Sequence, residues 1–247
     1  YNELTQSYTD QLHALKQNAI LIVDDNEINQ KVAMGLLESY GFELFTASNG
    51  EQALQRLNDY PQIRLVLMDC QMPVMDGFKT TELIRGGHAG EAKSKIPIIA
   101  MTAGAMTGDR EACLASGMND YLAKPLSAGD LEAKVGIWLS ASATLSTSIQ
   151  PKAQANCQAI VTESFWDKDA SLVRLLNDET LFLQMLDMFQ QQTPELLDSI
   201  HGHFQQQEFE QVRRDAHKLK GSASAIGANG VLDCARELEA AAQTADE

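Results

Sequence analysis

The chain has 247 residues, 44% of them hydrophobic, and a formal net charge of −15. This length suggests about two domains of ~100–200 residues, and no apolar run approaches the ~18 residues of a membrane-spanning helix. The acidic charge argues against nucleic-acid binding, which needs basic patches, and four scattered cysteines without metal spacing fit free thiols in a reducing cytoplasm.

After a polar lead-in segment at residues 1–18, short apolar runs alternate with amphipathic stretches. The β-branched run at 20–23 ends abruptly at Asp24 and Asp25 and predicts a buried parallel strand. Further strands are predicted at 43–47, 65–68, 98–101 and 119–122, and helices at 28–39, 50–58, 77–86, 107–116 and 127–139. Five strands alternating with five helices indicate an α/β doubly wound, five-stranded parallel sheet over residues 19–139.

The remainder of the chain has a different pattern. Residues 140–162 are rich in Ser, Ala, Thr and Gln with almost no charge, which predicts a flexible linker. From residue 163 onward, apolar residues recur only at three- and four-residue steps, as in the series Phe209, Val212, Ala216, Leu219, Ala223 and Ile226. No strand is predicted there, so residues 163–247 are expected to form an all-α helical bundle.

Polar side chains follow four strands of the predicted sheet. Asp24 and Asp25 end the first strand and Asp69 ends the third, and right-handed crossovers place these two strands side by side. Three crowded carboxylates repel one another, and Mg²⁺ would relieve that repulsion. Thr102 ends the fourth strand and Lys124 follows the fifth. Together these groups predict a phosphoryl-transfer site. The alternative, that each acid only caps a helix, has to explain all five residues in order.

Four sequence blocks resemble the response-regulator receiver domain, which has a flavodoxin-like fold. They are Ile22-Val23-Asp24-Asp25-Asn26, Leu67-Met68-Asp69-Cys70-Gln71-Met72-Pro73-Val74-Met75-Asp76-Gly77, Met101-Thr102-Ala103 and Lys124-Pro125. The resemblance implies that Asp69 is the phosphoacceptor. It also implies that Mg²⁺ is held by Asp24, Asp25, Asp69 and the backbone carbonyl of Gln71.

The same resemblance implies roles for three more residues and leaves alternatives open. Thr102 and Lys124 would contact the phosphoryl group. Tyr121 stands where the family has a switch aromatic, although a half-buried strand tyrosine fits the pattern equally well. An aspartate-dependent phosphohydrolase would need a second Asp two residues after Asp69, where this chain has Gln71. Cys70 is most simply a small buried residue.

One histidine of the helical part lies outside the apolar stripe. On a helical wheel, His217 is about 130° from the centre of that stripe, so it should face away from the core. Its helix neighbours are Arg213, Arg214, Lys220, Gly221 and Ser224. A glycine inside a helix costs about 1 kcal/mol relative to alanine, which would make sense if a bulky partner approaches the imidazole and the cations stabilise a phosphoryl group. An exposed histidine beside a packing glycine is the alternative.

The block Asp215-Ala216-His217-Lys218-Leu219-Lys220-Gly221-Ser222-Ala223, followed by Gly227-Ala228, resembles the histidine-containing phosphotransfer (Hpt) domain. This implies that His217 is phosphorylated on Nε2, that Lys220 assists and that Gly221 clears the approach. The family's bundle normally closes with a further helix after the one near 228–243. Because the chain stops at Glu247, we expect a bundle that lacks this last helix.

A receiver followed by an Hpt domain resembles the carboxyl-terminal portion of a hybrid sensor histidine kinase. The resemblance implies a relay from an upstream kinase histidine to Asp69, then to His217, then to a separate response regulator. Tyr1 is not Met, so we expect a piece of a longer histidine kinase, cytoplasmic itself, with its parent anchored in the inner membrane. No glycine-rich nucleotide loop is present, so this piece should not use ATP directly. A non-catalytic docking scaffold remains the alternative.

Overall fold

A computed structural model describes residues 18–38, 40–102, 107–141 and 165–245 of the chain. Within these ranges one parallel sheet has the strand order β2-β1-β3-β4-β5, which confirms the predicted α/β doubly wound fold. Its strands are β1 (Ala19–Val23), β2 (Glu43–Ala47), β3 (Ile63–Asp69), β4 (Ile98–Thr102) and β5 (Asp120–Ala123). The third strand begins two residues earlier than predicted because Ile63 pairs with Ala19, and Asp69 is its last residue.

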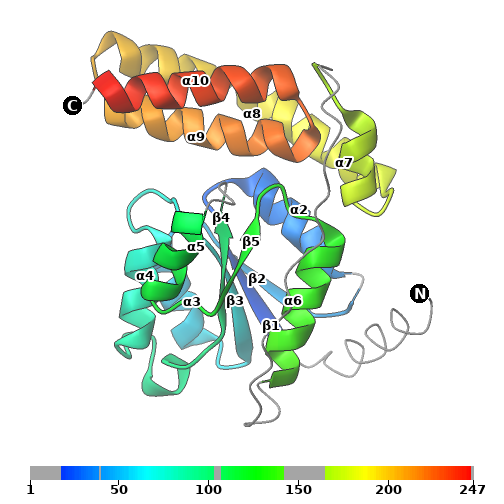
Figure 1. The fold of residues 1–247 in the computed structure, drawn as a ribbon, viewed down its shortest axis with the longest axis vertical. Coiled ribbons are helices and arrows are strands. Elements are labelled where there is room, and N and C mark those ends of the chain that lie inside the picture. The colour runs from blue at the N-terminus through cyan, green and yellow to red at the C-terminus, as the bar shows by residue number, and fades with distance from the viewer. Residues whose placement is uncertain (1–17, 39, 103–106, 142–164, 246–247) are drawn as a thin grey trace.

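Helices cover both faces of this sheet (Figure 1). Alternate residues of the fully buried strand β1 point to opposite faces, so Ile20 and Ile22 join one apolar core and Leu21 and Val23 join the other. Helices α2 (Glu27–Glu38) and α6 (Ala128–Ala141) contribute to the first core. The second core lies under α3 (Gly50–Asp59), α4 (Gly77–Arg85) and α5 (Thr107–Ala115), and a short 3₁₀ turn, η1 (Glu91–Lys93), precedes β4.

The carboxyl-terminal part is all helical in its described residues, as predicted. It consists of α7 (Lys168–Arg174), α8 (Glu179–Gln205), α9 (Phe209–Ile226) and α10 (Asn229–Ala245), with α8 and α10 both packed on α9. Asp167 and Asp178 cap the starts of α7 and α8 by accepting backbone hydrogen bonds. Gly227 ends α9 in the left-handed region (φ 75°), and a Cβ there would lie 2.4 Å from the Asp167 carbonyl oxygen.

The helical domain lies over the carboxyl ends of the strands (Figure 1). Helix α2 packs against α8 and α9, and one apolar cluster continues from Ile28 and Leu36 of α2 to Leu181, Phe182 and Met185 of α8. The predicted lead-in segment at 1–18 falls almost wholly outside the described residues, as does all but the start of the predicted linker at 140–162. Among the residues described, no helix is long and apolar enough to cross a membrane.

Candidate functional site

Three carboxylates gather at the end of β1 and β3. Asp24 and Asp25 directly follow β1, Asp69 ends β3, and their nearest carboxylate oxygens all lie within 4.8 Å of one another. Asp24 is fully buried and Asp69 is 3% exposed. The Lys124 ammonium lies 2.8 Å from Asp24 Oδ2 and 2.6 Å from Asp69 Oδ2. The structure therefore brings together four of the residues that the strand-end pattern predicts.

The charges in this corner are not balanced. Burial, reinforced by the neighbouring Asp24, raises the pKa of Asp25 to about 6. Burial likewise raises the pKa of Asp69 to about 7, although Lys124 acts in the opposite direction. The pKa of the Lys124 ammonium is itself raised, because attraction to Asp24 and Asp69 outweighs the cost of its burial. One lysine thus faces three carboxylates, and the corner holds excess negative charge at neutral pH.

A hard divalent cation fits this corner. Asp24 Oδ2 is fully buried and accepts no well-aligned hydrogen bond from any described residue; its contact with Lys124 is an ion pair only. Asp24 Oδ2 and the carboxylates of Asp25 and Asp69 offer the oxygen ligands that Mg²⁺ prefers, with water completing its octahedron. The geometry supports a cation site formed by Asp24, Asp25 and Asp69.

The remaining predicted residues are Thr102, Gln71 and Tyr121, which lie on or next to strands of the same sheet. Thr102 ends β4, is 8% exposed, and accepts a hydrogen bond at its carbonyl oxygen from Lys124 N at 2.7 Å. Gln71 N donates to Asp69 Oδ1 at 3.3 Å. Tyr121 is a half-buried residue of β5 whose ring lies below two cations, Lys134 at 4.9 Å and Arg110 at 5.7 Å from its centroid. Its placement is compatible with both expectations, a switch aromatic and a packed strand tyrosine.

A glycine permits the close packing around Asp69. At Gly77, the first residue of α4, a Cβ would lie 2.1 Å from the Asp69 carbonyl oxygen. The backbone N–H of Gly77 donates to the carbonyl oxygen of Cys70 at 3.2 Å. Any side chain at position 77 would therefore push α4 away from the end of β3.

His217 lies on α9 and is held by a residue of the next helix. Its Nδ1 is 2.6 Å from Glu239 Oε1, and Lys220 Nζ is 2.6 Å from Glu239 Oε2. Burial raises the pKa of Glu239, but the hydrogen bonds from His217 and Lys220 outweigh this and lower it to about 2. An ionised carboxylate has no proton to donate, so Nδ1 must carry the hydrogen of this bond. In the neutral imidazole, Nε2 then presents its lone pair.

The cations near His217 differ from those predicted from the sequence. Arg213 and Arg214 both bind Glu210, at 2.8 and 3.0 Å, because Glu210 lies three and four residues before them on the same helix face. Neither arginine lines the cavity between the two domains. Of the three cations expected beside the imidazole, only Lys220 reaches its immediate surroundings.

Asp69 and His217 line the same cavity of about 140 Å³ between the two domains. The α/β domain contributes Asp25, Asp69 and Lys124 to its wall. The helical domain contributes His217, Lys218, Lys220 and Arg236. Carboxylates on one wall thus face ammonium and guanidinium groups on the other.

The comparisons with known proteins agree with this geometry. Residues 20–136 match the family model of the response regulator receiver domain, and residues 184–247 match that of the Hpt domain. The chain is a receiver domain followed by an Hpt domain.

Two relatives of this receiver–Hpt chain are named as sensor proteins. It is 29% identical over 226 residues to the virulence sensor protein BvgS of Bordetella bronchiseptica, which covers 91% of this chain and 18% of BvgS. It is 42% identical over 119 residues to the sensor histidine kinase GacS of Pseudomonas protegens, covering 48% of this chain and 13% of GacS. The chain therefore spans less than a fifth of the length of these relatives.

A solved structure also resembles the receiver part. A protein described as a probable two-component system response regulator/GGDEF domain protein has 28% sequence identity and a TM-score of 0.51, covering 56% of this chain and 55% of that one. This similarity supports the receiver fold.

Two sets of contacts in the site were missed from the sequence, one made by Glu239 and one by Asn26. Glu239 lies 22 residues after His217 on the neighbouring Hpt helix α10, and the antiparallel pairing of α9 and α10 could have suggested it. Asn26 Nδ2 of the receiver donates to the Lys218 carbonyl oxygen at 2.9 Å and to Ser222 Oγ at 2.7 Å. No local pattern indicates that contact, because the partners are almost 200 residues apart.

Proposed function

We propose that the chain performs two successive steps of a two-component phosphorelay. Asp69 accepts a phosphoryl group from a histidine of an upstream kinase domain, passes it to His217, and His217 donates it to the receiver of a separate response regulator. The observation that carries this proposal is the shared cavity of about 140 Å³, which is lined by Asp69 and Lys124 of the receiver and by His217 of the Hpt domain. The match to receiver and Hpt families supports the same order of steps.

In the first step, a carboxylate oxygen of Asp69 attacks phosphorus and the bond to the donor histidine breaks. We infer that Asp24, Asp25, Asp69 and the carbonyl oxygen of Gln71 hold Mg²⁺, which neutralises charge on the phosphoryl oxygens when bound. Lys124, whose ammonium already contacts Asp69, and the Thr102 hydroxyl would each hold a phosphoryl oxygen. Tyr121 is proposed to follow Thr102 as the switch aromatic.

In the second step, the lone pair on His217 Nε2 attacks the phosphorus of phospho-Asp69. The P–O bond to Asp69 breaks, its electron pair returns to the carboxylate, and a P–N bond forms. Because Nδ1 keeps its hydrogen, the phosphorylated ring is a cation, and the ionised Glu239 at 2.6 Å stabilises it. Lys220 is held beside the ring by the other oxygen of Glu239 and can assist the transferring oxygens.

A labelling experiment tests the proposal. The full chain receives acetyl phosphate and Mg²⁺, and the label is followed in wild type, Asp69→Asn and His217→Ala. We expect both sites to be labelled in wild type, neither in Asp69→Asn, and only Asp69 in His217→Ala. The control is His201→Ala, an exposed histidine on α8 that should behave as wild type. A label that resists both acid and hydroxylamine would contradict the relay, since acyl phosphates and phosphohistidine are labile.

The experiment also separates the alternatives. A docking scaffold predicts no labelling at all, and a phosphohydrolase predicts continuous phosphate release that does not depend on His217.

We also propose that the parent protein is a histidine kinase anchored in the inner membrane, with this segment on the cytoplasmic side. The relative named as a sensor histidine kinase supports the kinase part of this proposal.

A further inference from the structure

Helix α2 of the receiver is shaped to fit the Hpt domain. At Gly35, which lies on α2, a Cβ would fall 2.4 Å from Cδ2 and 2.9 Å from Cδ1 of Leu181 on α8. Leu181 is only 6% exposed, so the missing side chain of Gly35 provides the space that this leucine fills. Above it, Gln192 of α8 donates to Glu27 of α2 at 2.9 Å.

Hydrogen bonds continue this contact up to the residue beside His217. Asn26 Nδ2 binds the carbonyl oxygen of Lys218 and the hydroxyl of Ser222 on α9. Between them, a Cβ at Gly221 would lie 3.2 Å from Asn29 Nδ2 and 3.4 Å from Asn26 Nδ2. Because Gly221 has no side chain, Asn26 and Asn29 of this chain's own receiver can pack closely against α9.

The receiver leaves little of His217 accessible. The His217 side chain is 14% exposed, and it lines a cavity that Asp69 and Lys124 of the receiver also line. A receiver that takes the phosphoryl group from His217 must bring its own aspartate in line with Nε2. That aspartate would have to occupy the position that Asp69 already holds.

We infer that the chain's own receiver, docked through α2 on α8 and α9, excludes the receiver of the downstream response regulator from His217. This inference rests on the proposed function and adds an order to it. Transfer from Asp69 to His217 takes place within one chain while the domains are docked, and onward transfer requires them to separate.

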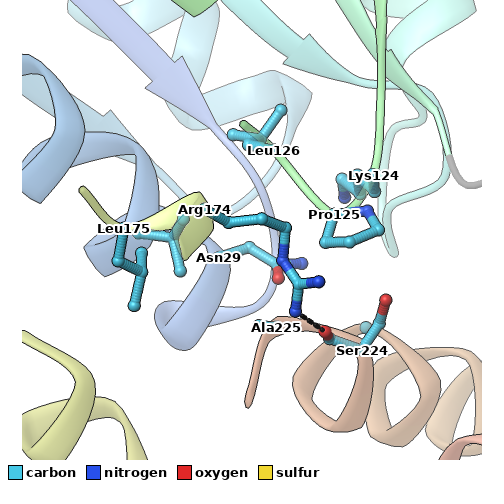
Figure 2. Close-up of a pocket in the computed structure, with 10 residues that line it drawn as sticks. Asn29, Lys124, Pro125, Leu126, Arg174, Leu175, Ser224 and Ala225 are labelled. Atoms are coloured by element: carbon cyan, nitrogen blue, oxygen red, sulfur yellow. Dashed lines mark hydrogen bonds between the residues drawn. The ribbon is translucent and has the colours of Figure 1, made fainter. Parts of the chain in front are cut away.

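The interface is not completely packed. A small cavity of about 20 Å³ remains between Pro125 and Leu126 of the receiver and Leu175 of the Hpt domain (Figure 2). This is enough for about one water molecule. The Arg174 guanidinium lies in this cavity, yet the hydrogen bonds found for it go to Ser171 Oγ and the Ser224 carbonyl oxygen, both within the Hpt domain.

The covalent connection makes the exclusion effective even if the contact is weak. Tethered domains meet at an effective concentration on the order of millimolar. A separate receiver at micromolar concentration would therefore compete poorly for His217. Loss of the α2 contact should remove most of this advantage.

A transfer assay between two chains tests the inference. The probe is the His217→Ala chain labelled at Asp69 with acetyl phosphate and Mg²⁺; the recipient is the Asp69→Asn chain, whose receiver can dock but cannot react. We expect that adding Gly35→Gln to the recipient speeds labelling of its His217 by about tenfold or more. The matched control is Gly202→Gln on α8, where a Cβ would meet nothing within 4 Å.

The outcomes distinguish this inference from the proposed function. Equal rates with and without Gly35→Gln would overturn the exclusion while leaving the relay intact, whereas no transfer in any arm would contradict the relay itself. Wild type supplies a measurement that does not depend on the variant. Its Asp69-to-His217 step should keep the same first-order rate on dilution, and a rate that falls with dilution would overturn docking within one chain.

Discussion

The two reacting residues of this molecule, Asp69 and His217, lie in opposite electrostatic environments. Asp69 is 3% exposed at the end of a central strand, where burial raises its own pKa and that of Asp25 and where Lys124 lies within ion-pair distance. His217 is 14% exposed on a helix face, beside a single carboxylate whose pKa is lowered. The aspartate end therefore depends on added positive charge, and the histidine end depends on orientation. Substitutions on each side should fail in different ways.

The largest effect is expected at Lys124, the one cation within ion-pair distance of Asp69 in the described residues. Lys124→Met should abolish labelling of Asp69 and lower the free energy of unfolding by about 3 kcal/mol at neutral pH, because it leaves buried carboxylates unpaired. Chemical denaturation and labelling with acetyl phosphate measure both effects. The control is Lys79→Met, an exposed pair with Glu82 that should cost less than about 1 kcal/mol.

Glu239 tests the histidine end. Glu239→Ala should slow transfer from Asp69 to His217 by about ten- to a hundredfold, since a charge-assisted hydrogen bond contributes about 1.5–3 kcal/mol. Rapid-quench kinetics of the full chain would measure this, and labelling of Asp69 should stay unchanged. Glu237→Ala, on an exposed position of the same helix, is the control. An unchanged transfer rate in Glu239→Ala would show that the carboxylate does not orient the imidazole.

The pH dependence of stability should expose the charge excess around Asp69. Raised pKa values of about 6 and about 7 mean that folded Asp25 and Asp69 bind protons more tightly than the unfolded chain does. Their contribution to stability is therefore present at low pH and is lost as the pH rises through about 6 to 7. Mg²⁺ binds the deprotonated carboxylates, so it should raise the melting temperature more at about pH 8 than at about pH 5. An equal shift at both pH values would contradict the cation site.

The smallest effects are expected at two helix caps that do not line the cavity. Asp76 caps α4 of the receiver and Asp178 caps α8 of the Hpt domain, each by accepting a backbone hydrogen bond. Replacing either with alanine should lower the free energy of unfolding by about 1 kcal/mol. Neither replacement should change the rate of transfer once both proteins are folded, as rapid-quench measurements at low temperature would show.

Part of the site could be predicted because the fold fixes it. In a parallel α/β sheet, the carboxyl ends of all strands lie at one edge, so the strand-end positions of Asp24, Asp69 and Lys124 predicted that they lie near one another. The prediction that Arg213 and Arg214 lie beside the His217 imidazole was wrong, because Glu210 on the same helix binds both. A helical wheel gives the direction of a side chain and leaves its partner open.

By itself, the sequence determined the two folds, the strand-end carboxylates and the outward direction of His217, since these follow from local periodicity and from the topology of parallel strands. Only the tertiary structure decided the rest. The proton position on His217 depends on Glu239 from another helix, and the approach of the two domains depends on Asn26 meeting Ser222. Such contacts join segments far apart in the chain, and they are set by how whole helices pack rather than by any local pattern.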